Sequence, residues 1–485
     1  SYLNPEHEAR IEAILREHCP DLFVSVSHDI ISLYREYERM STTALNAYVG
    51  PGTSEYLSQL SDGLRKSGFG ADLCLMTSAG GVIGVGEAIK RPVSLLLSGP
   101  VGALVAGIQC AEELDIENVI TLDVGGTSAD IGVAPRREMR MKHLLDNQIA
   151  GYDAMVPMCD IGTIGAGGGS IARMDGPLLR IGPQSAGADP GPACFGKGGS
   201  QPTLSDAYLL AGYIDPANFL GGRLSLDVGA AEEAMQGVAS ALRLDLAAAS
   251  DACVTVATSN MVARVLPYLA RYGVDPEDLT LVVCGGAGAL HGPLLAAEIG
   301  IGQVLVPTVP SVFCAFGGLV SEIVNDTAVS VQGTLVSSES LTEDFIRLEA
   351  EARSWLSAQI SEDLLTGVRI EHWAEMRYRG QSFELNVHLP ESAVRQGDMD
   401  SLAGVFHAEH ERLYAHADPK ADVEYVDLRV RVHGALTTPE RVSAEATQTP
   451  IDSAQKGQRS LRFGGKIFDD APIYDRALLG PGHHI

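Results

Sequence analysis

The chain has 485 residues, and its 35 Lys and Arg against 62 Asp and Glu give a formal net charge of −27. This charge repels nucleic acid and anionic membrane surfaces and argues against proteins that bind such polyanions. The low aromatic content of 6% and the 53 glycines favour a globular α/β enzyme of roughly three domains over a disordered or fibrous chain.

The eight cysteines are scattered, and no two have C-x-x-C spacing. They therefore predict neither a zinc knuckle nor a disulfide framework, and they favour a reducing, cytoplasmic location. The first residues do not form a signal-peptide pattern. The uncharged window from Ile299 to Val320 has the length of a membrane span, but prolines and glycines interrupt it. We interpret it as a strand, a loop and the start of a buried helix.

Strands alternate with helices in the N-terminal part, as in layered α/β folds. A helix is predicted over Glu6–His18, and Leu22–Ile30 alternates like a strand. A long amphipathic pattern follows, which Gly50-Pro51 is expected to interrupt. A strand near Leu73–Met76 and a helix across Val85–Lys90 complete this part.

A glycine turn joins two apolar runs between residues 121 and 133. Its polar and glycine residues are Asp123, Gly125, Gly126, Thr127, Ser128 and Asp130. The two glycines allow positive φ and bring backbone N–H groups close to an anion, while the two carboxylates can hold a hydrated Mg²⁺. The turn therefore predicts a phosphate hairpin of a nucleoside triphosphate site. The alternative is an ordinary turn between two strands.

A second glycine stretch spans residues 160–172 and contains three consecutive glycines, Gly167, Gly168 and Gly169. Their conformational entropy would normally be offset only by close backbone approach to a ligand or to another segment. A loose linker is the alternative. Apolar anchors on both sides of the glycines argue against a linker, which would be polar throughout.

A third stretch, Ser185–Gly196, contains prolines and glycines that exclude a helix or a central strand. We expect a long structured loop, in which Cys194 is either a nucleophile or, as the pattern favours, a packed thiol. Helices are predicted over Ala230–Leu242 and Leu246–Arg271.

The predicted strand Leu279–Val283 runs into a fourth glycine-rich segment, formed by Gly285, Gly286, Ala287 and Gly288. A glycine turn between a strand and a helix can present its backbone to a base or ribose. His291 follows it, as a ligand-facing side chain or as a hydrogen-bonding residue at the helix entry.

A small α+β domain is predicted after Asp326. His407 and His410 share a helical face there, with marginal metal-ligand spacing, and we interpret them as part of a solvated face. The last segment, Ser460–Ile485, alternates like β-strands. The expected domains are residues 1–95, 96–332, 333–440 and 441–485.

Four motifs, in this order, resemble the hydantoinase A / 5-oxoprolinase family: Asp123-Val-Gly-Gly-Thr-Ser-Ala-Asp130, Thr163-Ile-Gly-Ala-Gly-Gly-Gly-Ser-Ile-Ala172, Gly187-Ala-Asp-Pro-Gly-Pro-Ala-Cys194 and Gly285-Gly-Ala-Gly-Ala-Leu-His291. The resemblance covers nearly the whole chain. The family includes N-methylhydantoinase A-like enzymes, 5-oxoprolinases and the ATP-binding subunits of acetone and acetophenone carboxylases. It implies a ribonuclease-H-like core of the sugar-kinase, actin and Hsp70 superfamily, with a small α+β domain and the start of a C-terminal β-rich domain.

The resemblance also implies the chemistry of the site. Asp123 to Asp130 corresponds to a phosphate hairpin, with Asp123 and Asp130 catalytic and Asp123 the Mg²⁺ ligand, and Gly285 to Gly288 corresponds to the adenosine-side turn. The implied reaction transfers a phosphoryl group from ATP to the carbonyl oxygen of a cyclic amide, which a hydantoinase B-like partner then hydrolyses.

The match departs from the family at one important point. The family has an earlier Asp-x-Gly-Gly-Thr hairpin in an N-terminal lobe, and nothing before Asp123 supplies it. We therefore expect another chain or segment to supply the missing lobe. The alternatives are an ATP-binding subunit of a ketone carboxylase and a non-catalytic nucleotide-binding scaffold.

Overall fold

The computed structural model describes residues 4–331, 336–439 and 450–484. The chain forms two compact units. Unit 1 comprises Ser1–Val105, Arg140–Asp160 and Gly318–Thr438, and unit 2 comprises Ala106–Met139, Ile161–Gly317 and Pro439–Ile485. The domain boundaries expected from the sequence stay predictions, and those at residues 332 and 440 lie outside the described residues.

The helices are α1 Glu6–His18, α2 Ser27–Ile30, α3 Glu36–Lys66, α4 Val85–Lys90, α5 Ser98–Glu113, α6 Leu204–Leu210, α7 Val228–Leu242, α8 Leu246–Tyr272, α9 Gly288–Ile299, α10 Phe313–Val320, α11 Ser338–Gln359, α12 Glu391–Gln396 and α13 Met399–Tyr414. The strands are β1 Cys74–Met76, β2 Val82–Gly84, β3 Asn118–Val124, β4 Ala129–Ala134, β5 Gln148–Ile149, β6 Tyr152–Asp153, β7 Ile161–Ile164, β8 Ser170–Asp175, β9 Leu178–Ser185, β10 Leu279–Cys284, β11 Gln303–Leu305, β12 Ile323–Ser330, β13 Leu365–Tyr378, β14 Leu385–Leu389, β15 Val423–Leu436, β16 Gln455–Phe463 and β17 Lys466–Tyr474.

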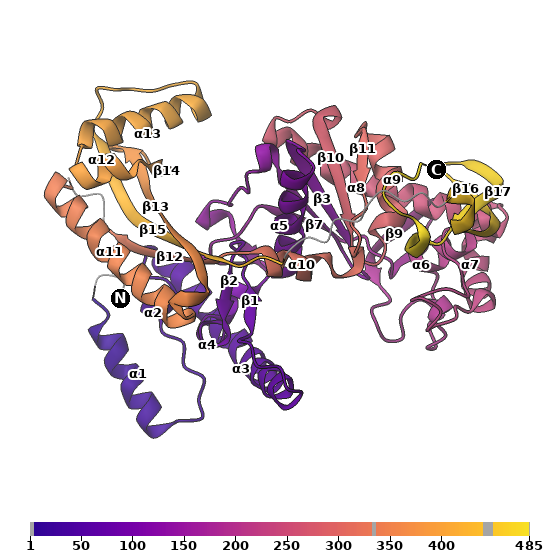
Figure 1. Ribbon diagram of the computed structural model, residues 1–485, viewed down its shortest axis with the longest axis horizontal. Coiled ribbons are helices and arrows are strands. Elements are labelled where there is room, and N and C mark those ends of the chain that lie inside the picture. Colours follow the sequence, from indigo (N-terminus) through magenta and orange to yellow (C-terminus); the bar gives the residue numbers. More distant parts are fainter. Residues whose placement is uncertain (1–3, 332–335, 440–449, 485) are drawn as a thin grey trace. The chain divides into compact units, whose positions relative to one another are not determined.

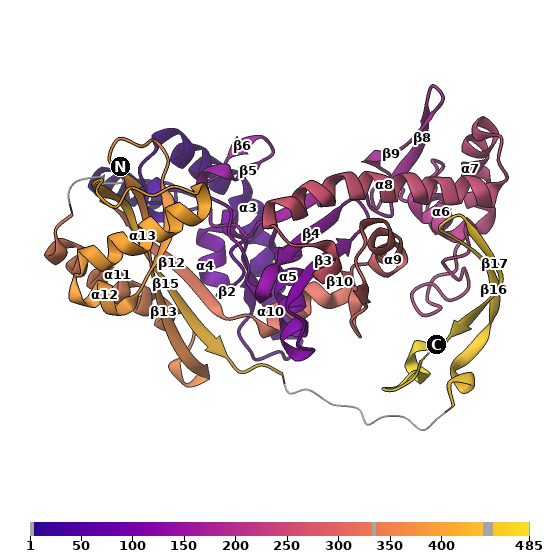
Figure 2. The ribbon, with the colours of Figure 1, turned by 90° about the horizontal axis from the view of Figure 1, so that it is seen from above.

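Unit 2 is built on a five-stranded mixed sheet of order β11-β10-β3-β4-β7. Strand β10 is parallel to β11 and β3, whereas β4 is antiparallel to both β3 and β7. All six residues of β10 are buried, as expected for a strand covered on both faces. Helix α8 lies along this sheet (Figure 2), and its buried residues share one apolar core with those of β3, β4 and β10.

Helix α8 is long and apolar enough to cross a membrane by length and composition alone. Within unit 2 it is a core helix, because Cys253, Ala257, Met261 and Val265 are fully buried in the core that it shares with the sheet. The C-terminal hairpin of β16 and β17 packs against the same unit, where the Arg462 N–H donates to the Ala211 carbonyl at 2.9 Å.

Unit 1 contains a six-stranded sheet of order β1-β2-β12-β15-β13-β14. Helices α11, α12 and α13 cover one face of its β12 to β15 portion (Figure 1), and Phe345, Leu402 and Phe406 contribute to the apolar core between them. The side chains of a strand alternate between the two faces of its sheet, so the polar residues of β13 and β15 lie on the opposite face.

That opposite face is strongly charged. Asp326 of β12 pairs with Arg431 of β15 through two hydrogen bonds of 2.7 and 2.8 Å. Four residues before Arg431 on the same strand, Asp427 is paired in register with Glu375 of β13. Burial and the neighbouring carboxylates of Glu375 and Glu384 raise the pKa of Asp427 to about 7. Unit 1 therefore holds a buried carboxyl group that is protonated below neutral pH.

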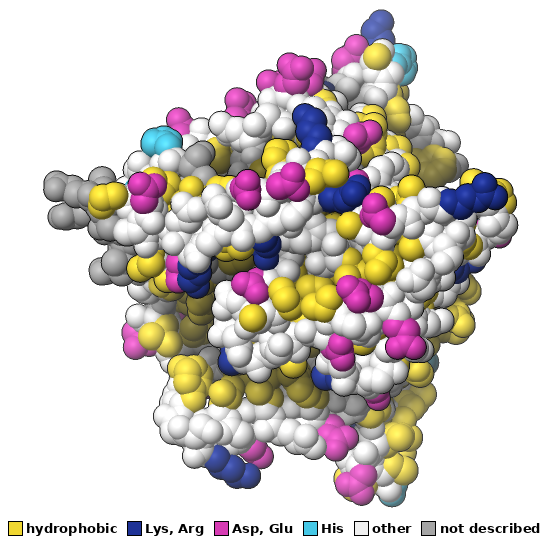
Figure 3. Space-filling view, turned by 90° about the vertical axis from the view of Figure 1, so that its right-hand side faces the viewer, with side chains coloured by type: hydrophobic (Ala, Val, Ile, Leu, Met, Phe, Trp, Pro, Cys, Tyr) yellow, Lys and Arg dark blue, Asp and Glu magenta, His cyan; other side chains and the backbone are white. Residues whose placement is uncertain are grey.

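On the face of the molecule seen in Figure 3, the acidic residues are dispersed and do not form one cluster. Asp and Glu side chains are distributed over this face, with Lys and Arg side chains and small hydrophobic patches between them. The net charge of −27 therefore does not form a single acidic patch on that face.

Three local predictions can be compared with the structure. The predicted strand at Leu22–Ile30 is wrong, because Ser27–Ile30 forms helix α2, where the Glu8 carboxylate accepts a hydrogen bond from the Ser27 hydroxyl at 2.7 Å. The interruption expected at Gly50-Pro51 is also wrong. Helix α3 continues through Pro51, and the Phe23 ring packs tightly against Gly50. The strand and helix predicted for Ile299–Val320 are confirmed by β11 and α10, but α10 is not a buried helix, because only Phe313 and Gly317 are buried and Leu319 is exposed.

The raised pKa of Asp427 predicts a specific pH dependence of stability. An unfolded aspartate titrates near 3.9, so between about pH 4 and pH 7 only the folded chain keeps this proton, and stability falls as pH rises. Asp427→Asn should therefore raise the melting temperature at pH 8 by roughly 2 °C or more, with little gain at pH 4.

Asp326→Asn is the matched control on the same sheet face. Burial acts to raise the pKa of Asp326, but Arg431 and Arg429 outweigh it and lower that pKa to about 2. This substitution should lower the melting temperature at pH 8. A change of the melting temperature in the same direction in both variants would contradict the opposite pKa shifts of Asp427 and Asp326.

Candidate functional site

Four polar side chains form a row across the sheet of unit 2. The pairing register places Thr163 of β7 opposite Asp130 of β4, Asp130 opposite Asp123 of β3, and Asp123 opposite Cys284 of β10. Directly paired residues of neighbouring strands project to the same face of a sheet. The row therefore gathers two carboxylates, a hydroxyl and a thiol at the end of β3, where the phosphate hairpin begins.

The two carboxylates have different partners. Asp130 accepts hydrogen bonds from the Thr163 hydroxyl at 2.6 Å and from the Ser128 hydroxyl at 3.3 Å. Burial, and to a smaller extent the neighbouring Asp123 charge, raise the pKa of Asp130. Asp123 accepts a hydrogen bond from the thiol of Cys314 at 3.1 Å. A cation bound between these carboxylates would relieve their mutual repulsion.

The tip of the hairpin offers free backbone donors. The Gly125 N–H donates to the Ser128 carbonyl at 3.0 Å, and Gly126 and Thr127 are exposed. The N–H groups of Gly126, Thr127 and Ser128 donate no hydrogen bond within residues 4–331, 336–439 and 450–484. Exposed N–H groups at a tight turn form an anion-binding concavity. The positive φ expected at Gly125 and Gly126 is wrong, since neither residue adopts it.

The second glycine stretch packs directly on this hairpin. The N–H groups of Gly168 and Gly169 donate to the carbonyls of Gly125 and Gly126, at 3.0 and 2.6 Å. A Cβ atom on Gly167 would lie 2.7 Å from the Thr127 nitrogen. The three glycines therefore permit the close approach of another chain segment. The sequence left open whether the glycines approach a ligand or another segment, and the structure shows contact with the hairpin.

The fourth glycine segment lies on the other side of the hairpin. The Ala287 N–H donates to the Val124 carbonyl at 3.0 Å. Gly285 has a φ of +77°, and a Cβ atom there would lie 2.5 Å from the Val124 carbonyl oxygen and even closer to the Asp123 carboxylate. The structure thus brings together the hairpin, Gly167 to Gly169 and Gly285 to Gly288 within unit 2.

Two residues considered as functional candidates are structural. His291 is fully buried, and its ring nitrogens lie 2.7 Å from the Tyr208 hydroxyl and 3.2 Å from that of Thr258. Burial lowers the pKa of His291 to about 4, so the ring is neutral near pH 7. Cys194 is fully buried, and burial raises the pKa of its thiol, in agreement with a packed rather than a nucleophilic cysteine.

The interpretation of His407 and His410 as a solvated helix face is wrong. His410 is buried, and His407 lies 2.8 Å from the Tyr378 hydroxyl. Both rings pack near Tyr378 of β13, an arrangement that the helical spacing alone could not show.

Three residues of the site were not identified from the sequence. Thr163 lies within the second glycine stretch and Cys284 directly precedes the fourth, so the sequence did contain a signal for both residues. Cys314 lies 191 residues from its partner Asp123 and has no motif around it. Only the fold could bring it to the hairpin.

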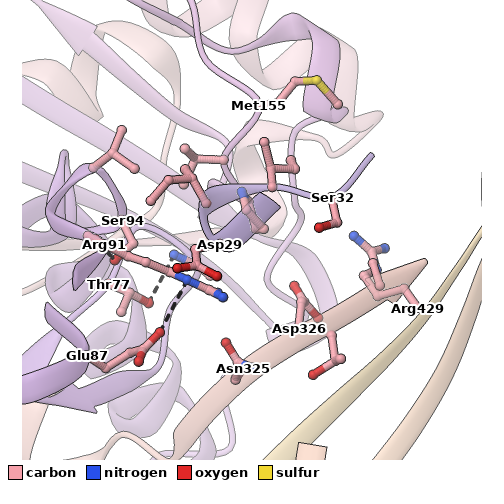
Figure 4. Close-up of a pocket in the computed structure, with 18 of the residues that line it drawn as sticks. Asp29, Ser32, Thr77, Glu87, Arg91, Ser94, Met155, Asn325, Asp326 and Arg429 are labelled. Atoms are coloured by element: carbon pink, nitrogen blue, oxygen red, sulfur yellow. Dashed lines mark hydrogen bonds and ion pairs between the residues drawn. The ribbon is translucent and has the colours of Figure 1, made fainter. Parts of the chain in front are cut away.

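Unit 1 contains a separate cavity of about 380 Å³ (Figure 4). Ser32, Thr77 and Asn325 contribute hydroxyl and amide groups to its lining. Two of its carboxylates have cationic partners, since Glu87 pairs with Arg91 at 3.3 Å and Asp326 pairs with Arg431. Arg429 also lines the cavity, and its buried Nε has no hydrogen-bond partner among the described residues.

The position of Gly285 predicts a large effect of a single methyl group. Gly285→Ala combines a left-handed backbone with a collision against Val124 and Asp123, and should destabilise unit 2 by about 2 kcal/mol or more. Gly286→Ala is the matched control, because nothing lies within 4 Å of its Cβ position. Thermal unfolding of both variants should show a loss for the first alone; equal melting temperatures would contradict the turn geometry.

Comparisons with known proteins agree with this arrangement. Residues 39–327 match the family model described as Hydantoinase/oxoprolinase, and residues 333–485 match that of the Hydantoinase/oxoprolinase C-terminal domain. The caprolactamase subunit alpha of Pseudomonas jessenii is 33% identical over an alignment of 494 residues, and the alignment covers 99% of this chain and 70% of that protein.

Two solved structures share the mixed α/β fold. ATP-dependent caprolactamase from Pseudomonas jessenii matches with a TM-score of 0.77 and 33% identity, over 98% of this chain and 70% of that one. Nucleotide-free acetone carboxylase matches with a TM-score of 0.78 and 26% identity, over 98% and 69%. With both family models together spanning most of its length, the chain belongs to the hydantoinase/oxoprolinase family.

Proposed function

We propose that this chain is the ATP-binding subunit of an ATP-dependent cyclic amide hydrolase, which activates the carbonyl oxygen of a lactam, imide or hydantoin. The observation that carries the proposal is the hairpin tip. Its free N–H groups stand next to two carboxylates that face each other across β3 and β4. Membership in a family with an ATP-dependent caprolactamase supports the same class of reaction.

The residues of the site fit a bound Mg²⁺ and the phosphates of ATP. Mg²⁺ prefers oxygen ligands and usually binds one or two carboxylates together with phosphate oxygens, and Asp123 and Asp130 supply such carboxylates. The N–H groups of Gly126, Thr127 and Ser128 would bind phosphate oxygens. Gly285 to Gly288 would face the adenosine side, where Gly286 leaves open space. The mixed sheet, with β4 as its one antiparallel strand, supports a ribonuclease-H-like core.

ATP, when bound, supplies a phosphoryl group that turns an amide oxygen into a leaving group. The chain itself would contribute positioning and electrostatics. Asp123 would hold the cation, and the hairpin N–H groups would stabilise negative charge on the phosphate oxygens. Thr163 holds Asp130 in place through its short hydrogen bond. A hydantoinase B-like subunit would hydrolyse the activated amide, and a second phosphate hairpin from another chain or segment would complete the clamp.

A second candidate is the corresponding subunit of a ketone carboxylase. The two TM-scores, 0.77 and 0.78, do not separate the possibilities, whereas the identity of 33% against 26% favours the lactam-hydrolysing relative. The eight free cysteines suit a reducing cytoplasm for either complex.

Mg·ATP binding tests the site by isothermal calorimetry. Asp123→Asn should weaken binding at least about tenfold, because it removes a charged cation ligand. Asp469→Asn is the control, as this exposed carboxylate lies on β17 of the same unit and outside the site. Gly286→Val should also weaken binding by filling the open space beside the turn. Unchanged affinity in Asp123→Asn would remove the hairpin from the site.

Substrate-dependent ADP release, measured with the natural partner subunit, tests the reaction. A cyclic amide should stimulate ADP release more than a ketone with bicarbonate, and Asp130→Asn should reduce that stimulation at least about tenfold. Stimulation by the ketone alone would favour the carboxylase. If the chain binds ATP but neither substrate stimulates ADP release, the result would favour the alternative of a non-catalytic nucleotide-binding scaffold.

A further inference from the structure

A cluster of two thiols and one carboxylate lies at the start of the phosphate hairpin. The metal-binding atoms of Asp123, Cys284 and Cys314 all lie within 4.8 Å of one another. The Cys314 sulfur is 3.1 Å from the Asp123 carboxylate oxygen. Cys284 is buried, whereas Asp123 and Cys314 are only half-buried, so an ion can reach the cluster from that side.

Two separate structural constraints hold the cluster together. The parallel register of β10 and β3 places Cys284 beside Asp123. Cys314 lies in the first turn of α10, and the segment before this helix is tied to the turn after Cys284, because the Gly285 N–H donates to the Pro310 carbonyl at 2.9 Å. The cluster is therefore part of the folded framework of unit 2 and not a chance approach of flexible side chains.

The other buried thiols of this unit stand singly. Cys253 lies in the apolar main core, and Cys194 packs among Leu209, Leu226 and Ala231 beside the Asp206 carboxylate. Cys284 and Cys314 differ from both, because two thiols there lie close to one carboxylate.

Two sulfur donors and one oxygen donor are characteristic of thiophilic divalent ions rather than Mg²⁺. For a zinc–sulfur distance near 2.3 Å, tetrahedral ligands lie roughly 3.8 Å apart. The donor atoms of the cluster lie within 4.8 Å of one another, a range that includes this spacing. We propose that Asp123, Cys284 and Cys314 form a binding site for a thiophilic divalent cation of the Zn²⁺ or Cd²⁺ type.

Binding forms two metal–sulfur bonds and one metal–oxygen bond, and the two thiol protons pass to the solvent. Three protein ligands leave a fourth position for water or another oxygen ligand. If Asp123 also serves Mg·ATP, as the proposed function states, the thiophilic ion competes for that carboxylate. Zn²⁺ would then act as an inhibitor that takes the hairpin carboxylate away from the nucleotide.

Titration with Cd²⁺ alone tests the site, because a cadmium–thiolate bond has an ultraviolet charge-transfer band. The band should saturate at one ion per chain in the absence of nucleotide. Cys284→Ser and Cys314→Ser should each weaken binding by at least about 100-fold, since the loss of an outer partner of a metal ligand alone costs about 10 to 100-fold. Cys19→Ser, which removes an exposed thiol of unit 1, should leave the band unchanged.

A band of the same strength in the double variant Cys284→Ser/Cys314→Ser would overturn the proposal, and so would the absence of a band in the unsubstituted chain. Thermal unfolding shows whether the double variant is folded. If it is not, Asp123→Asn, which keeps both thiols, should still weaken Cd²⁺ binding at least about tenfold, and unchanged affinity would equally overturn the site.

A separate experiment tests whether the thiophilic ion competes with Mg·ATP for Asp123, which rests on the proposed function. Zn²⁺ should weaken Mg·ATP binding in the unsubstituted chain and not in Cys314→Ser. A normal Cd²⁺ band without any effect of Zn²⁺ on Mg·ATP would sustain the metal site and reject the shared role of Asp123.

Discussion

The pairing register of β3 with its two neighbours is the constraint on which the site depends. It aligns Asp123 with Asp130 on one side and with Cys284 on the other. Because side chains alternate along a strand, a slip of one residue would move Asp123 to the opposite face and expose Leu122 or Val124, both of which are fully buried. The apolar residues on either side of Asp123 thus select the register that presents the carboxylate.

Backbone packing around the hairpin follows from that register. The turn that connects β3 and β4 is contacted by two glycine-rich segments, and at two of their positions only glycine fits. Gly167 supports it from one direction and Gly285 from the other, each with a Cβ position that another backbone would occupy. The glycine-rich composition of these segments therefore reflects contacts within the protein as much as contacts with a ligand, and the free donors remain at the exposed tip.

The same few atoms support two kinds of cation chemistry. The carboxylates of Asp123 and Asp130 present oxygen ligands that suit a hard cation, whereas Cys284 and Cys314 add soft ligands to Asp123 alone. In the two proposals, both ions would use the Asp123 carboxylate, so that binding of one would exclude the other. Unit 1 differs from this arrangement. Two carboxylates that line its cavity, Glu87 and Asp326, are paired with arginines, and burial raises the pKa of Asp427 on its charged sheet face.

The sequence by itself determined the glycine motifs, their order and the family, because these depend on local residue types and spacing. It also predicted the hairpin strands and the interrupted window at Ile299–Val320. Only the tertiary structure decided that Phe23 packs against Gly50 in an unbroken α3, that His410 is buried, and that Cys314 reaches Asp123. Those features depend on contacts between residues far apart in the chain, and neither propensity nor periodicity carries information about such contacts.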